Sequence, residues 1–201
     1  MSKISDEKII DLDEVIREIG KLAKMHVIVG PAGKPESNIA AIAAVHEYGA
    51  TIKPKKGKYL AVPAHPAAKG KSPREWSDLH FKPNKKGGGT LSQADGTVMY
   101  ILVKQVKIPE RAFMRKTFAS AAAINKVNRI AKDAVARILT GKGTARNAAD
   151  ACGASLSASV RSTITKGLTP PNSPLTLALK RGSLPLYDEG YLHKSISWEV
   201  V

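Results

Sequence analysis

The chain has 201 residues, 43% of them hydrophobic, and its 32 Lys and Arg against 17 Asp and Glu give a formal net charge of +15. This length fits one domain with a buried core, and the ordinary apolar content excludes a wholly disordered chain. A single cysteine, Cys152, excludes an intramolecular disulfide framework and a multi-cysteine metal cluster. Residues 51–150 hold 21 of the basic side chains and only 6 of the acidic ones. This excess leaves two interpretations open: a polyanion or an acidic surface as a partner, or a solvated basic face that binds no ligand.

The first predicted element is a helix that starts at an N-cap, Ser5, and ends near Gly20, because the aliphatic residues between them recur at helical spacing. This stretch has no apolar run suited to a signal peptide or a membrane span, so we expect synthesis in the cytoplasm and no membrane partner. A short strand is predicted over 25–29. A second helix is predicted over 39–48, ended by Gly49.

Residues 53–96 are rich in Lys, Pro and Gly, and they predict an inserted basic, β-rich arm. Apolar islands at 59–62 and 79–81 predict strands, which we expect at sheet edges or in hairpins because prolines interrupt the segment. Residues 83–89 predict a mobile tip between two extended segments. The apolar run 98–103 predicts a strand.

In the second half, Pro109 predicts the first turn of a helix, since proline is tolerated there. An amphipathic helix is predicted over 124–138 and another over 146–166. Strict alternation over 195–200 predicts a half-buried strand. Together these elements predict an α+β fold in which a small antiparallel sheet is packed by amphipathic helices. Residues 1–201 are expected to form one domain, with 53–96 as the inserted arm.

The sequence contains no complete catalytic motif. A phosphate-binding loop is excluded at Gly30–Gly33, where only two residues separate the glycines and Pro35 replaces the hydroxyl residue. The pair His46-Glu47 lacks the second histidine of a zinc-protease helix. We therefore predict that the chain is not an enzyme, and we assign no catalytic, cofactor-binding or metal-binding residues and no cofactor.

The basic side chains of the arm are candidate contacts with a DNA backbone or with an acidic protein surface, and the composition leaves both alternatives open. Aromatic residues are sparse and no base-reading motif is visible, so any DNA contact is expected to be independent of sequence. The candidate interface residues are Lys53, Lys55, Lys56, Lys58, Lys82, Lys85, Lys86, Arg111 and Arg115.

Three segments carry distinctive motifs: AAIAAVHEYGATI (40–52), KIPERAFMRKTF (107–118) and PPNSPLTLALKRGSLPLYDEGYLHKSISWEV (170–200). In the same order, they resemble segments of the virion-morphogenesis or tail-completion family of long-tailed bacteriophages. The structural motif of the last segment consists of Asp188, Gly190, Leu192 and Ser195, and Asp188 is predicted to cap the N–H groups of residues 190–191. The usual Asp-Thr-Gly turn of the family is Asp-Glu-Gly here, and Tyr187 replaces an aliphatic residue.

The resemblance implies a structural virion protein at the neck or tail end, which completes the tail and joins it to the head as a subunit of a homo-oligomeric ring. Implied partners are a head-side connector and tail-tube or tail-terminator proteins, with non-specific contact to packaged DNA. We expect the aromatic residues Tyr48, Phe113, Phe118 and Trp198 to build the subunit core. The alternatives are a sequence-independent DNA-binding protein and a transient capsid-assembly factor.

Overall fold

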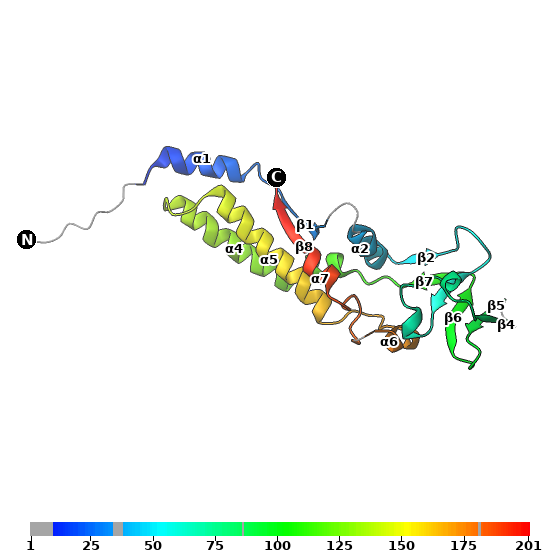
Figure 1. Cartoon of the computed structure of the whole chain (residues 1–201). Coiled ribbons are helices and arrows are strands. Elements are labelled where there is room, and N and C mark those ends of the chain that lie inside the picture. The colour runs from blue at the N-terminus through cyan, green and yellow to red at the C-terminus, as the bar shows by residue number, and fades with distance from the viewer. Residues whose placement is uncertain (1–9, 34–37, 86, 181) are drawn as a thin grey trace, which may run out of the picture. The chain divides into compact units, whose positions relative to one another are not determined.

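The computed structural model describes residues 10–33, 38–85, 87–180 and 182–201 (Figure 1). Its helices are α1 (Leu12–Leu22), α2 (Ile39–Tyr48), α3 (Phe113–Phe118), α4 (Ala121–Leu139), α5 (Ala145–Thr165), α6 (Pro174–Ala178) and α7 (Tyr191–Ser195). Its strands are β1 (Val27–Pro31), β2 (Ala50–Ile52), β3 (Leu60–Pro63), β4 (His80–Asn84), β5 (Gly88–Ser92), β6 (Val98–Val103), β7 (Val106–Ile108) and β8 (Ile196–Val200). Helices and small antiparallel sheets confirm the predicted α+β class.

Most predicted elements are found close to their expected bounds. The helix over 39–48 and the strand over 98–103 coincide with α2 and β6. The first residues of two helices differ from the prediction. Helix α1 begins at Leu12, where the side chain of Asp11 accepts from the N–H groups of residues 13 and 14; the predicted cap, Ser5, lies outside the described residues. Helix α3 begins at Phe113, four residues after Pro109.

The chain groups into two compact units. The helical unit consists of the described residues of 1–40, 113–163 and 192–201, and the sheet unit consists of those of 41–112 and 164–191. Each unit is therefore built from segments that are distant in the sequence. The expectation that residues 1–201 form one domain stays a prediction.

In the helical unit, α4 and α5 run side by side and are joined by a short turn (Figure 1). Helix α5 is rich in Ala, Ser and Gly, and its buried positions lie on more than one side of the helix, as expected where both flanks are covered. Strands β1 and β8 form a two-stranded antiparallel ribbon in which Val27 pairs with Val200. The guanidinium groups of Arg146 and Arg161 on α5 donate to the carbonyls of Val200 and Ile196, which joins the helix to β8.

The aromatic residues expected in the core divide into two groups. Phe113 is 1% exposed and Trp198 is half-buried against α5. Tyr48 and Phe118, by contrast, are 67% and 42% exposed, so the prediction that they build the core is wrong. Both stand at the last position of their helix.

In the sheet unit, β2 pairs with β7, and a four-stranded antiparallel sheet has the order β3-β6-β5-β4. The proline-containing strands β3 and β4 are the edges of this sheet, as predicted for residues that lack a ladder donor. Three of its strands come from residues 53–96, so the predicted arm is part of one sheet with β6. Buried Met99 and Tyr100 form the core of this unit with Ala68.

Candidate functional site

Arg111 lies where three segments of the sheet unit meet. Its backbone N–H donates to the carbonyl of His46 at 2.7 Å. Its guanidinium donates through Nε to the carbonyl of Pro170 at 2.8 Å and through Nη2 to that of Pro171 at 3.0 Å. The planar guanidinium presents its donors in a fixed fork, which suits two acceptors held side by side. One residue therefore connects the end of α2, the segment after β7 and the start of the C-terminal segment.

This position differs from the surface contact predicted for Arg111. The residue is only 6% exposed, because its hydrogen bonds are made within the sheet unit. Burial lowers the pKa of Arg111, but an arginine remains protonated at ordinary pH. Arg115, in contrast, is exposed on α3 of the helical unit. The two arginines of the second resemblance segment therefore have different surroundings.

His46 lies in the last turn of α2, and its carbonyl accepts from the Arg111 N–H. Its Nδ1 atom is buried and has no hydrogen-bond partner among the described residues. Burial lowers the pKa of His46, and the positive charges of Arg111 and Lys180 lower it further. Both effects favour the neutral imidazole at neutral pH.

Gly49 brings the turn after α2 close to the segment that follows β7. Its φ angle is 72°, and a Cβ atom built on it would lie 2.9 Å from the backbone nitrogen of Glu110. A larger residue would meet both a strained backbone conformation and a collision with main-chain atoms. The glycine of His-Glu-Tyr-Gly thus permits contact between the first two resemblance segments.

The third segment contributes Lys180 and Asp188. The Lys180 ammonium donates to the carbonyl of Leu184 at 2.5 Å, and burial lowers the pKa of this lysine. Asp188 accepts from Lys69 at 3.2 Å. It makes no bond in the described structure to the N–H groups of residues 190–191, so the predicted cap is wrong. Because α7 begins at Tyr191, residue 190 occupies the cap position and Asp188 lies two residues too early.

The remaining motif residues have structural surroundings. Gly190 is buried with a φ angle of 79°, a conformation that favours glycine. In the helical unit, Leu192 is buried, and the Ser195 hydroxyl donates to the carbonyl of Leu192 at 2.8 Å. The motif therefore shapes the turn into β8.

The strand register gathers lysines from distant parts of the sheet unit. Ile52 at the end of β2 pairs with Val106, and Leu60 at the start of β3 pairs with Val103. The connection from β2 to β3 and the short link from β6 to β7 therefore leave the sheets at the same place. The first carries Lys53, Lys55, Lys56 and Lys58, and the second carries Lys104.

The β4–β5 hairpin adds two more lysines to this place. Gly89 at the start of β5 pairs with Leu102, so the hairpin turn lies at the end of the sheet where β6 finishes. A Cβ atom on Gly87 would lie 3.1 Å from the Lys104 ammonium, which puts that lysine beside the turn. We call this surface the lysine-rich end; its members, all exposed, are Lys53, Lys55, Lys56, Lys58, Lys82, Lys85 and Lys104. The predicted Lys86 lies outside the described residues.

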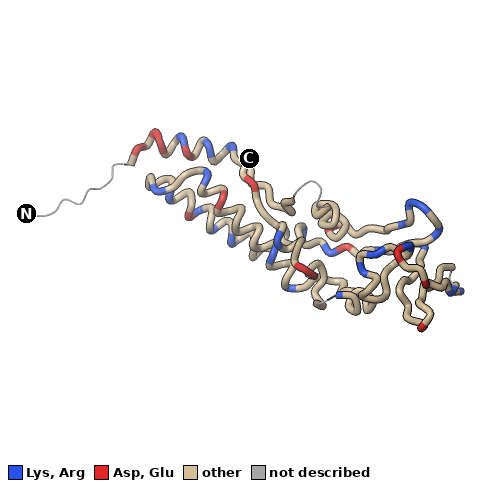
Figure 2. Tube along the Cα trace, viewed as in Figure 1, with Lys and Arg blue, Asp and Glu red and all other residues tan. Residues whose placement is uncertain are grey.

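The opposite end of the four-stranded sheet carries carboxylates. Asp95 stands in the β5–β6 turn and accepts from the N–H and hydroxyl of Thr97 at 2.8 and 3.0 Å, which lowers the pKa of this carboxyl. Asp78, just before β4, accepts from Gln93 at 3.3 Å. Figure 2 shows Lys and Arg along the β2–β3 connection and an acidic position at the β5–β6 turn. The sheet is therefore basic at one end and acidic at the other.

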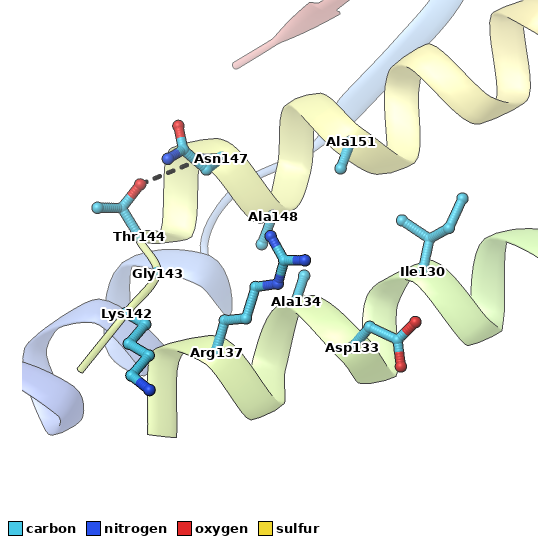
Figure 3. A pocket seen from close by; sticks show the side chains of 10 residues that line it. All are labelled: Ile130, Asp133, Ala134, Arg137, Lys142, Gly143, Thr144, Asn147, Ala148 and Ala151. Carbon is cyan, nitrogen blue, oxygen red and sulfur yellow. Dashed lines mark hydrogen bonds between the residues drawn. The ribbon is translucent and has the colours of Figure 1, made fainter. Parts of the chain in front are cut away.

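A cavity of about 260 Å³ lies between α4 and α5 in the helical unit (Figure 3). Ile130 of α4 and Ala148 of α5 line it, and the Arg137 side chain points from α4 toward α5. The Gly-Lys-Gly-Thr turn beside it serves to start α5, since the Thr144 hydroxyl accepts from the Asn147 N–H at 3.2 Å. The carboxylate of Glu18 already accepts from the first N–H of α5 at 2.7 Å, so a phosphate would compete with it there.

Sequence reasoning missed three of these features. Lys104 follows directly on the predicted strand 98–103, so its place at the strand end could have been found from the sequence. The roles of Glu18 and His46 depend on contacts with distant residues, which no local pattern reveals.

Cys152 is half-buried, and burial raises the pKa of its thiol. In the described ranges, no three His, Cys, Asp or Glu side chains gather as a metal site would need.

No family model, curated protein or solved structure matches this chain. None of the helices within the described residues is long and apolar enough to cross a membrane.

Proposed function

We propose that the chain is a structural virion protein of a tailed phage or prophage, which acts at the neck or tail end as a subunit of an oligomeric ring. The observation that carries this proposal is the contact among the three resemblance segments. Arg111 of the second segment bonds to His46 of the first and to Pro170 and Pro171 of the third. The parts of the three segments that lie in the sheet unit are therefore joined by hydrogen bonds, and this contact supports a relationship among the co-linear motifs.

The exposed apolar residues supply surfaces that a ring subunit needs. Leu12 and Ile16 lie one turn apart on α1 and are each about 70% exposed. In the sheet unit, Tyr48 is similarly exposed at the end of α2. Apolar side chains on adjacent turns form a patch of the kind that mediates protein association. In a closed ring such patches would face a different surface of the next subunit.

The partners in this proposal are a head-side connector and the tail-tube or tail-terminator proteins. A transient capsid-assembly factor is the alternative that shares these partners, and it differs in leaving before the particle matures. A sequence-independent DNA-binding protein is the second alternative, favoured by the lysine-rich end.

The experiment that tests the proposal is electron microscopy of lysates from the encoding phage with a stop codon early in this reading frame. We expect DNA-filled heads beside separate, complete tails, because a missing neck subunit leaves both parts unable to join. A plasmid copy of the wild-type chain should restore joined particles. Absent or malformed heads would favour the capsid-assembly factor, and intact infectious virions would overturn the proposal.

A further inference from the structure

In the described part of the chain, none of the seven lysines of the lysine-rich end makes an ion pair. Three acidic side chains of the same unit are engaged elsewhere: Glu75 accepts from the Ser72 N–H at 2.6 Å, and Asp78 and Asp95 accept at the opposite end of the sheet. The positive charge at this end is therefore available to an external anion.

The composition of this surface favours nucleic acid over protein. Four lysines fall within six positions, Lys53–Lys58, and proline and glycine occupy the other two. Protein–protein interfaces are depleted in lysine and enriched in aromatic residues and arginine, whereas the DNA backbone is bound chiefly through lysine and arginine. The nearest aromatic side chain of the connection, Tyr59, is half-buried. An acidic protein is thus the less favoured partner.

We propose that the lysine-rich end binds the phosphate backbone of duplex DNA without reading its sequence. Each lysine acts as a point charge that replaces a condensed counterion, so affinity comes from counterion release. The lysines lie on connections and on a hairpin. In the described part of the sheet unit, none of them lies on a helix that could enter a DNA groove. The inference rests on the proposed virion role only for the identity of the DNA as packaged phage DNA. DNA binding itself is a property that can be measured on the purified chain.

The test is fluorescence anisotropy of the full chain with two labelled duplexes of unrelated sequence, over a series of salt concentrations. We expect equal affinity for both duplexes. With seven phosphate contacts, affinity should fall by roughly 6,000-fold between 50 and 200 mM salt. The variant Lys53→Gln/Lys55→Gln/Lys56→Gln/Lys58→Gln should retain only about three contacts and fall by roughly 40-fold over the same range.

A matched variant controls for net charge. Lys126→Gln/Arg129→Gln/Lys132→Gln/Arg137→Gln removes the same four charges from exposed positions of α4 in the helical unit. We expect its salt dependence to stay close to that of the wild type. Equal loss in both variants would overturn the proposal, since bulk charge alone would then explain binding.

Two further outcomes decide against the inference. Tighter binding to polyglutamate than to DNA would assign the surface to an acidic protein, and absence of DNA binding at 50 mM salt would remove the site altogether. Thermal unfolding of both variants should match the wild type, because all eight side chains are exposed. None of these outcomes bears on whether the stop-codon phage fails to join heads and tails, so the two proposals fail independently.

Discussion

At the residue scale, Gly153 lets Trp198 approach α5 closely. A Cβ atom on Gly153 would lie 2.3 Å from Cδ1 and 2.6 Å from Cγ of the indole. The ring is also fixed by its N–H, which donates to Asp150 at 3.2 Å. We predict that Gly153→Ala lowers the free energy of unfolding by about 1–3 kcal/mol through overpacking, although alanine is the better helix former.

Gly20→Ala is the matched control for this prediction, measured by the same urea unfolding series. Gly20 also lies in a helix, but a Cβ atom there would meet nothing within 4 Å. Alanine should therefore stabilise the protein by roughly 0.5–1 kcal/mol at this position. The same sign of change for both substitutions would contradict the packing account.

The lowered pKa of His46 gives the fold a dependence on mildly acidic pH. A histidine whose pKa is lower in the folded state than its unfolded value of 6.5 binds more protons when unfolded. Stability should therefore decline as pH falls from 6.5 through the lowered folded value. We predict that His46→Gln makes this decline shallower, measured as the free energy of unfolding between pH 7.5 and 5.5.

His80→Gln serves as the comparison, because His80 is exposed on β4. An equal change of pH dependence in the two variants would contradict the assignment to His46. His193 also has a pKa lowered by burial, so some decline should persist in the His46 variant. A His46 resonance that titrates above pH 6.5 in the native protein would show that the assigned sign is wrong.

At the element scale, Glu18 joins α1 to the start of α5. Its carboxylate accepts from the Lys21 ammonium at 2.6 Å and from the Ala145 N–H at 2.7 Å. These bonds hold the pKa of Glu18 below its usual 4.5, and the bond from Lys21 has the largest effect. The contribution to stability is therefore present above pH 4.5 and is lost as pH falls through the lowered value.

We predict that Glu18→Gln lowers the free energy of unfolding at pH 7 and makes its loss below pH 4.5 shallower. The measurement is urea unfolding at pH 7 and over the acidic range. Glu14→Gln is the control, because Glu14 is exposed on the same helix and meets Arg17 only at 4.0 Å. Part of the acid dependence should survive in the Glu18 variant, since Asp95 and Asp150 also have lowered pKa values.

The sequence predicted those elements whose pattern is local, and it missed contacts between distant segments. Helix α2 and strand β6 were predictable because their residues carry a clear period or apolar run with a glycine or turn beside them. The position of Arg111 could not be predicted in this way, because its partners are a carbonyl of α2 and two carbonyls that lie 59 and 60 residues later in the chain. Likewise, the lysines of the arm were visible in the sequence, but only the register showed that they share one end with Lys104.

At the scale of the whole molecule, the chain passes between its two units at 40/41, 112/113, 163/164 and 191/192. The sheet unit is thus completed by a late segment, 164–191, that returns after the long helices. Arg111 stands just before one of these crossings and bonds to two carbonyls of that late segment. Its guanidinium therefore contributes to holding the unit's two segments together.

We predict that Arg111→Met weakens this attachment while keeping an apolar stem of similar length. Loss of the hydrogen bonds from a charged donor should lower the free energy of unfolding by about 2 kcal/mol. Limited proteolysis with mass spectrometry should show faster cleavage within 164–191. Arg115→Met, an exposed arginine four residues later, is the matched control. Lysine lacks the planar guanidinium that donates to two acceptors, so Arg111→Lys should restore protection from cleavage only in part. An equal rate of cleavage within 164–191 in the Arg111→Met and Arg115→Met variants would exclude the role of Arg111 in joining the segments.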